Sequence, residues 1–339
     1  MMEILLLFSL VISFLLTVMV LPFWIKKTKQ IGFLWEDMNK PLKWGKRKNI
    51  SASGGIVVVI AFVLGVLYYI AIRTFLIEST NGISLEIFAL LSVILILAMV
   101  GIIDDLFGWK HGGLSIRARL ILIFMASIPL VVINAGVSTM SIPFFGSVNF
   151  GILYPLLLIP IGIVGATATY NFLAGFNGLE ASQGIIILSF LSFVAYKTGS
   201  AWLSLVGLIM VAALLGFYIY NKYPAKVFPG NSITWAIGAL IAGMAILGNF
   251  EKIAVFIFIP YIIETGLKLR GKLEKHSFAK LNKDGSLEMP YKKIYGLEHL
   301  AICILKKYKP SKKAYEKEVV YLINAFQLGI IIIGFLIFF

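Results

Sequence analysis

Long apolar runs alternate with short polar connections along almost the whole chain. A membrane-spanning helix needs about 20 apolar residues to cross roughly 30 Å of hydrocarbon. Runs that approach this length occur at Ile4–Ile25, Ile56–Ile72, Leu85–Ile103, Leu120–Ile133, Ile152–Asn171, Leu179–Tyr196, Trp202–Tyr220, Ile233–Leu247, Ile253–Leu267 and Val319–Phe339. The pattern predicts an all-α polytopic membrane protein with about ten transmembrane helices in one domain, residues 1–339.

The segment 268–318 is too polar to cross a membrane and is predicted to be a loop within that domain. Its Asp284-Gly285 pair lies between two short stretches and predicts a small β-hairpin. Further along, Ile294, Leu297, Ala301 and Ile304 recur at helical spacing. This spacing predicts an amphipathic helix that could lie on the membrane surface.

The composition excludes a soluble domain. The 339 residues are 60% hydrophobic, with a mean hydropathy of +0.95. No basic residue precedes the first run and no small-residue cleavage pattern follows it, so we interpret it as a retained span and not as a signal peptide. Cys303 is the single cysteine, which excludes an intrachain disulfide framework and a cysteine-based metal site.

The basic residues lie mostly on one side of the predicted spans. The connections after the odd-numbered spans hold 27 of the 30 lysine and arginine residues, leaving Arg73, Lys197 and Lys252 for the other side. By the positive-inside rule this predicts a multi-pass cell-membrane protein with a lysine-rich cytoplasmic face and both termini outside. The net charge of +14 would attract anionic headgroups and substrates to that face. Nucleic acid is disfavoured as a partner, because the charges are spread over membrane-bound loops without a nucleic-acid-binding motif.

A polar stretch, Tyr170–Gln183, lies between two apolar runs. On one straight helix Asn171 and Asn177 would project roughly 120° apart at about 100° per residue, so a site that uses both needs a break. Gly175 and Gly178 supply that break. A new helix near Gly178 would point its free N–H groups at this turn, which suits a phosphate. A polar turn at the membrane surface is the alternative interpretation.

Two adjacent carboxylates, Asp104 and Asp105, follow the third apolar run. At mid-bilayer they would cost about 5–7 kcal/mol, so we expect them at the end of the helix. Neighbouring carboxylates repel and favour a nearby cation, which suits a metal-binding or base role. Solvated acids at the start of a loop are the alternative. Arg117 and Arg119 come next, and could clamp a diphosphate or simply anchor the following helix.

The connection after the seventh run carries Pro229-Gly230, a chain break, followed by Asn231-Ser232. Asn231 and Ser232 can cap the next helix, which would present a second helix N-terminus suited to phosphate. Phe228, just before the break, could stack on a planar base. An interfacial aromatic residue and an ordinary helix cap are the alternatives.

These motifs together resemble the polyprenyl-phosphate N-acetylhexosamine-1-phosphate transferases. The closer resemblance is to the eukaryotic and archaeal branch, which transfers N-acetylglucosamine-1-phosphate from UDP-N-acetylglucosamine to dolichyl phosphate. The resemblance covers nearly the whole chain and is carried by the segments 37–40, 50–55, 104–105, 171–183, 223–228 and 281–289. Residues 174–181, Ala-Gly-Phe-Asn-Gly-Leu-Glu-Ala, are similar to the N-acetylglucosamine branch.

The resemblance implies a ten-span enzyme, usually a homodimer, that needs Mg²⁺ or Mn²⁺ in its place and starts lipid-linked oligosaccharide assembly for N-glycosylation. By the same resemblance Asn171 would hold the metal, Asn177 and Phe228 the uracil, and the aspartate pair the acceptor phosphate. The implied metal ligands are Asn171 and Asn231, the catalytic residues Asp104, Asp105 and Arg119, and the substrate-binding residues Lys40, Asn177, Glu180, Phe228, Lys275 and His276.

Three positions depart from the family pattern. Asn231 stands where the family usually has an aspartate metal ligand, Arg119 where it has a lysine, and Ser277 where it has an arginine. Asn231 keeps an oxygen ligand but removes a negative charge. The diphosphate and the aspartate pair would therefore have to supply more of the charge around Mg²⁺.

The hypothesis from the sequence is attack of a lipid phosphate oxygen on the β-phosphorus of a UDP-sugar, with release of UMP. A covalent aspartyl intermediate is the rival mechanism. Another UDP-N-acetylhexosamine, used for a cell-envelope glycan, is an alternative substrate. A transporter or lipid scaffold is an alternative of another class, and it predicts ionisable residues deep within several spans. Glu264, near the end of the ninth run, is the one such residue in the sequence.

Overall fold

The computed structural model describes residues 2–39, 49–77, 82–142 and 146–339. Within these ranges, seven helices are long and apolar enough to cross a membrane. They are α1 (Met2–Ile31), α2 (Gly55–Phe75), α3 (Ile83–His111), α7 (Leu179–Lys197), α8 (Ala201–Asn221), α9 (Asn231–Gly248) and α13 (Glu316–Phe338). The prediction of an all-α polytopic membrane protein is confirmed.

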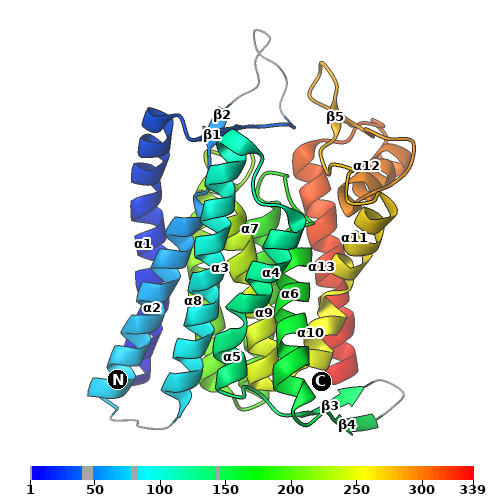
Figure 1. Cartoon of the computed structure of the whole chain (residues 1–339). Coiled ribbons are helices and arrows are strands. Elements are labelled where there is room, and N and C mark those ends of the chain that lie inside the picture. The colour runs from blue at the N-terminus through cyan, green and yellow to red at the C-terminus, as the bar shows by residue number, and fades with distance from the viewer. Residues whose placement is uncertain (1, 40–48, 78–81, 143–145) are drawn as a thin grey trace.

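Three further elements run the length of the bundle as pairs of shorter helices (Figure 1). The pairs are α4 (Ile116–Ala126) with α5 (Ile128–Val132), the π-helix η1 (Tyr154–Leu158) with α6 (Ile159–Tyr170), and α10 (Glu251–Ile257) with α11 (Ile259–Arg270). A proline stands in the first turn of each second helix, where it has no N–H to give to the preceding turn. Among the described residues, the seven long helices meet the length and apolarity of a membrane span, and the three pairs coincide with the other predicted apolar runs.

Helix α9 forms the centre of the bundle. Its most apolar window is 94% buried, against 22% for α1 and for α13, which lie at the periphery. Helix α3 approaches α9 closely, because a Cβ added at Gly101 would lie 2.6 Å from the backbone of Asn231. This contact brings the last turns of α3 against the first turn of α9.

The two ends of the bundle differ in their elements (Figure 1). One end carries both termini and the hairpin of β3 (Thr139–Ile142) and β4 (Gly146–Asn149). The opposite end, here called the loop end, carries β1 (Leu34–Glu36) paired with β2 (Asn49–Ser51), and also the elements of the polar segment 268–318 described next. The termini thus share an end, as predicted. That the loop end is cytoplasmic remains a prediction from the charge distribution.

The polar segment 268–318 contains the two elements expected from its pattern. Strands β5 (Lys280–Leu281) and β6 (Leu287–Glu288) form a hairpin, with Gly285 at a positive φ of 80° in its turn. Helix α12 (Leu297–Tyr308) is amphipathic, but its buried face packs on α11 and α13 at the loop end. Its apolar side therefore belongs to the protein core, and is not free to cover the membrane surface.

Candidate functional site

The aspartate pair lies near the end of α3 but not at its terminus. The helix continues from Asp105 to His111 and ends at Gly112, whose φ of 86° needs a glycine. The expectation that the pair ends the helix is therefore wrong by about two turns. Both side chains are nonetheless almost fully buried, at 2% and 1% exposure. Buried carboxylates need hydrogen-bond donors, and the surrounding elements provide them.

The side chain of Asp105, which belongs to α3, lies at the N-terminus of α9. Its carboxylate accepts the backbone N–H of Asn231 at 3.0 Å through each oxygen, and the hydroxyl of Ser53 at 2.6 Å. A Cβ at Gly230 would lie 2.3 Å from this carboxylate, so only glycine fits there. The sequence predicted that this helix end is free for phosphate and capped by Asn231 or Ser232. Both expectations are wrong, because Gly230 is the N-cap without a side-chain cap bond and Asp105 takes the helix N–H.

Asp104 is held by three groups. The Arg119 guanidinium contacts it with Nη2 at 3.1 Å and Nε at 3.3 Å, the backbone N–H of Leu114 donates at 2.6 Å, and the amide of Asn231 donates at 2.6 Å. Arg119 is therefore more than a membrane anchor, since it pairs with a buried acid. Asn231 contacts both aspartates, one through its backbone and one through its side chain.

Two polar cavities lie beside this cluster. The first, here called the asparagine cavity, has a volume of about 270 Å³ and is lined by Trp35, Asn171, Glu180, Phe228, Asn231 and Phe278, among others. The second, the basic cavity, has a volume of about 540 Å³ and carries Arg119, Lys268, Lys275 and His276. Asn171 and Phe278 line both cavities, so the two spaces adjoin each other at these residues.

The loop between α6 and α7 shapes the asparagine cavity. Asn171 caps α6, and its side-chain oxygen accepts the hydroxyl of Thr234 on α9 at 2.9 Å. The chain breaks at Gly175 and Gly178, with φ of 100° and 86°, as the sequence predicted. The carboxylate of Glu180 folds back to accept the backbone N–H of Gly175 at 2.9 Å. Asn171 and Glu180 thus face one space from opposite ends of this loop.

Asn177 belongs to this loop but is not part of the wall of the asparagine cavity. Its backbone N–H donates to Glu316 at 2.8 Å, and its amide donates to Asp37 at 3.2 Å and to Glu316 at 3.5 Å. The sequence alone does not predict that Glu316 belongs to this site. It is the first residue of α13, and no local pattern marks it as part of a site 139 residues away. In this structure Asn177 anchors the loop.

The remaining predicted residues lie around the same cluster. Lys275 and His276 line the basic cavity, where Lys275 lies over the ring of Tyr291 at 5.4 Å from its centre. Phe228 lines the asparagine cavity, and its backbone N–H donates to Ser51 at 2.8 Å. Lys40 lies outside the described residues. The structure thus gathers all the other predicted residues at the loop end, with Asn177 in a supporting position.

The side-chain oxygen atoms of this site could bind a divalent cation, but they do not complete its coordination shell. Among the described residues, no group of three or more histidine, cysteine, aspartate or glutamate side chains could hold a metal ion. Asn171, Asn231 and Glu180 nevertheless bring side-chain oxygen atoms to the asparagine cavity. Oxygen ligands of this kind suit Mg²⁺, which usually binds through one or two protein groups together with substrate phosphates. The site therefore fits a cation that arrives with a diphosphate.

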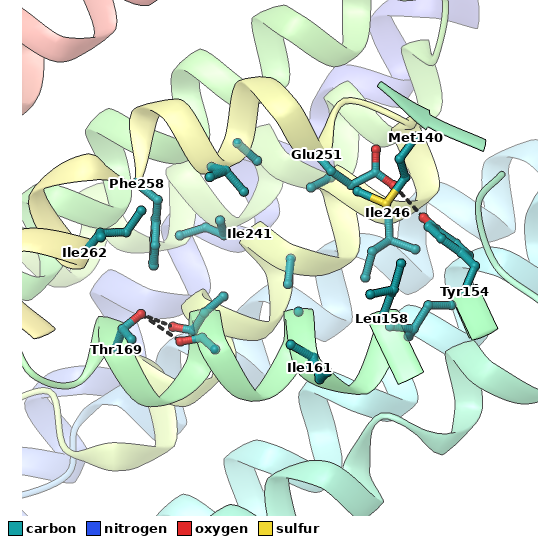
Figure 2. Close-up of a pocket in the computed structure, with 18 residues that line it drawn as sticks. Met140, Tyr154, Leu158, Ile161, Thr169, Ile241, Ile246, Glu251, Phe258 and Ile262 are labelled. Carbon is teal, nitrogen blue, oxygen red and sulfur yellow. Dashed lines mark hydrogen bonds between the residues drawn. The ribbon is translucent and has the colours of Figure 1, made fainter. Parts of the chain in front are cut away.

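An apolar cavity of about 350 Å³ lies within the bundle between η1, α6, α9, α10 and α11. Figure 2 shows Thr169 and Ile262 at one end and the pair Tyr154–Glu251 at the other, where the tyrosine hydroxyl donates to the carboxylate at 2.5 Å. Thr169 lies two residues before Asn171. An apolar chain in this cavity would therefore have its end near the polar cluster.

The sequence is similar to one family of transferases and to several individual transferases. The sequence profile of glycosyl transferase family 4 matches residues 87–249, from α3 to the end of α9. A Sulfolobus acidocaldarius protein provisionally named UDP-N-acetylglucosamine–dolichyl-phosphate N-acetylglucosaminephosphotransferase is 35% identical, over 83% of both chains. A Saccharolobus solfataricus protein with the same provisional name is 36% identical, over 87% of this chain and 86% of its own. The phospho-N-acetylmuramoyl-pentapeptide-transferase of Halalkalibacterium halodurans is 29% identical, over 80% and 86%.

Proposed function

The chain belongs to glycosyl transferase family 4, and on that premise we propose that it transfers N-acetylglucosamine-1-phosphate from UDP-N-acetylglucosamine to dolichyl phosphate and releases UMP. The two archaeal relatives are named for this donor and acceptor. The observation that carries the proposal is the convergence of Asp104, Asp105 and Asn231 beside two adjoining cavities, one with asparagine oxygens and one with cations.

The asparagine cavity suits the donor. Phe228 offers a ring on which uracil can stack, and Asn171, Asn231 and Glu180 face the same space with oxygen atoms. Mg²⁺ held there with the diphosphate would neutralise the charge that develops on the transferred phosphoryl group. Asn177, Glu316 and Asp37 keep the cavity loop in shape through the hydrogen bonds described above.

The basic and apolar cavities suit the acceptor. A prenyl phosphate carries two negative charges on an apolar chain, so it needs cations at one end and hydrocarbon contacts along the rest. Arg119 and Lys275 supply cations, while Ile116, Leu120 and Ile123 of α4 form an apolar wall of the basic cavity. The apolar cavity, which Thr169 lines at one end, offers a further space for hydrocarbon.

We favour direct attack over a covalent aspartyl intermediate. An oxygen of the acceptor phosphate forms a bond to the β-phosphorus of the donor, the bond between that phosphorus and the bridging oxygen breaks, and UMP leaves with the bonding electrons. The second pKa of the acceptor phosphate is about 6, so this group is largely ionised at neutral pH without a base. Both oxygens of Asp104 already accept hydrogen bonds, which favours an orienting role over a nucleophilic one.

A panel of UDP-sugars, tested with one prenyl phosphate and Mg²⁺, tests the choice of substrate. We expect the fastest UMP release with UDP-N-acetylglucosamine. Faster release with another UDP-N-acetylhexosamine would move the protein to a different glycan, and release with none of them from folded protein would favour the transporter or scaffold interpretation. Rapid-mixing experiments should show no burst of protein-bound sugar phosphate, and a stoichiometric burst would favour the covalent route.

The setting of the reaction is part of the same proposal. We place the site at the cytoplasmic membrane surface with both termini outside, because the lysine-rich connections converge at the loop end. A homodimer remains a prediction from the family resemblance.

A further inference from the structure

Lys268 is a buried cation in the wall of the basic cavity. It is on the last turn of α11, is only 7% exposed and lines the cavity. Its ammonium group forms an ion pair with Glu264 at 3.3 Å and donates a hydrogen bond to the hydroxyl of Ser277. A lysine ammonium has three N–H donors, so this arrangement leaves capacity for a ligand.

A second buried carboxylate belongs to the same cluster. Glu298 on α12 is fully buried. A Cβ added at Gly296 would lie 2.6 Å from Glu298 Oε2 and 3.1 Å from Glu264 Oε1, so both carboxylates flank one point. Glu298 therefore lies beside the buried ion pair of Glu264 and Lys268.

Burial shifts the pKa values of two side chains beside Lys268. Burial, and then the negative charge of Glu264, raises the pKa of Glu298 well above its usual range. Burial, and then the positive charge of Lys268, lowers the pKa of His299 to about 4. Both shifts favour the neutral forms of these side chains, so neither favours a further charge beside the ammonium group of Lys268.

We propose that Lys268 binds the phosphate group of the prenyl acceptor, a role that rests on the proposed function. The nearby wall of the basic cavity from α4 is apolar, and Ile116 and Leu120 are more than 40% exposed, as expected for positions that contact lipid. A ligand in this cavity meets cations and hydrocarbon together, whereas the asparagine cavity offers oxygen atoms. Because Lys268 reaches the cavity from the buried side, it can hold a phosphate that enters along the membrane.

The alternative is that Lys268 serves only to stabilise the fold through its ion pair with Glu264. The two roles predict different results. Replacing Lys268 alone would leave Glu264 as an uncompensated buried charge and could unfold the protein. The double variant Glu264→Gln/Lys268→Met removes both charges together and keeps the net charge of the cluster. Lys268→Arg keeps the cation. Lys272→Met, at an exposed position four residues further on, removes a lysine outside the cavity and serves as the control.

Binding is measured in detergent by the shift in Tm that geranylgeranyl phosphate causes, with geranylgeraniol, inorganic phosphate and UDP as the other ligands. We expect the double variant to lose at least tenfold in affinity for geranylgeranyl phosphate but to bind UDP and geranylgeraniol as the wild type does. Lys268→Arg should recover most of the affinity, and Lys272→Met should match the wild type. Inorganic phosphate should bind far more weakly than the lipid phosphate, because it lacks the apolar contacts.

Equal affinity of the wild type and the folded double variant for geranylgeranyl phosphate would overturn the proposal. So would a loss confined to UDP, which would move Lys268 to the donor side. In turnover assays the double variant should raise the KM for the acceptor at least tenfold and leave the KM for the donor within about twofold. Since binding is measured without turnover, a wild type that binds the lipid phosphate through Lys268 but releases no UMP would refute the transferase function and leave this site standing.

Discussion

The side-chain amide of Asn231 donates a hydrogen bond of 2.6 Å to the carboxylate of Asp104, across 127 positions of sequence. The family resemblance predicts an aspartate at position 231. An aspartate there would place a third carboxylate against two buried acids, where it would repel them unless a cation intervened. The asparagine instead ties α9 to α3 through a hydrogen bond that needs no metal.

Asn231→Asp should therefore make the protein more dependent on Mg²⁺ for stability. We expect the Tm in EDTA to fall by several degrees, Mg²⁺ to restore it, and the concentration of Mg²⁺ that gives half-maximal activity to fall several-fold, because the added charge strengthens the metal site. Thermal unfolding at a series of Mg²⁺ concentrations measures this. Asn249→Asp, an exposed change at the other end of α9, is the control. An unchanged Mg²⁺ titration would place Asn231 outside the metal site.

Asp104→Asn should abolish turnover while the protein stays folded. The change keeps the size of the side chain but removes the charge that Arg119 and the amide of Asn231 bind. We expect kcat/KM to fall by at least about 100-fold, the range of lost electrostatic preorganisation at active sites. UMP release measures the rate, and size-exclusion chromatography with thermal unfolding checks the fold. Asp284→Asn in the exposed β5–β6 hairpin should leave the rate unchanged, and turnover near that of the wild type for Asp104→Asn would refute its role.

Much of this site can be predicted from sequence, since short motifs carry it. The aspartate pair, Asn171, Asn231 and the glycine breaks at positions 175 and 178 are all local features, and the structure brings them together. Glu316 could not be predicted, because its role depends on where α13 begins relative to a loop 139 residues away. The capping prediction for Asn231 failed for a related reason. A distant carboxylate, Asp105, binds the helix N–H that a local cap would have taken.

The positions of helix breaks and of contacts between helices are also hard to predict from the sequence. Apolar runs predicted ten crossings, but not that proline divides three of them into paired helices with a cavity beside two of these pairs. Nor does the sequence indicate that Glu298 lies beside the ion pair of Lys268 with Glu264, which is 34 residues earlier in the chain. Such pairings depend on how α12 packs against α11.

Glu316→Gln should weaken donor binding more than it slows the chemical step. The glutamate accepts both the backbone and side-chain N–H groups of Asn177, and the neutral amide of glutamine can replace only one of these bonds well. We expect the KM for UDP-N-acetylglucosamine to rise by roughly tenfold or more, because a hydrogen bond to a charged group is worth about 1.5–3 kcal/mol, with a smaller change in kcat. Glu318→Gln, which breaks a surface pair with Lys309, is the control and should change neither constant. A fall in kcat alone would contradict this positioning role.

Gly165→Leu should obstruct the apolar cavity without unfolding the protein. A Cβ at Gly165 meets no atom within 4 Å, and the residue lines the cavity on α6. Replacing glycine inside a helix also favours the helix by up to about 1 kcal/mol. We expect a higher KM for long-chain dolichyl phosphate, an unchanged KM for UDP-N-acetylglucosamine, and a Tm at least that of the wild type. Gly266→Leu on α11, where a Cβ also meets open space but which lies outside the cavity, should change none of these.

The pKa of His299 predicts how stability changes in acid. Burial and Lys268 lower this pKa from 6.5 to about 4 in the folded protein. The unfolded chain therefore binds the proton first as the pH falls, so the contribution of neutral His299 is complete above pH 6.5 and is lost between 6.5 and about 4. The Tm of the wild type should fall across this range. His299→Asn should have a lower Tm at pH 7 and a shallower fall, and an equally steep fall would show that other groups cause it.

In the proposed reaction the β-phosphorus of the donor moves to the lipid, so a phosphorus label follows that atom. Purified protein is given UDP-N-acetylglucosamine radiolabelled at the β-phosphate, with dolichyl phosphate and Mg²⁺, and the organic and aqueous phases are counted. We expect the label to enter the organic phase together with the sugar, unlabelled UMP to appear in equal amount, and Asp104→Asn to give neither product. Label that remains in aqueous UDP while sugar reaches the lipid, or no transfer by folded wild-type protein, would refute this reaction.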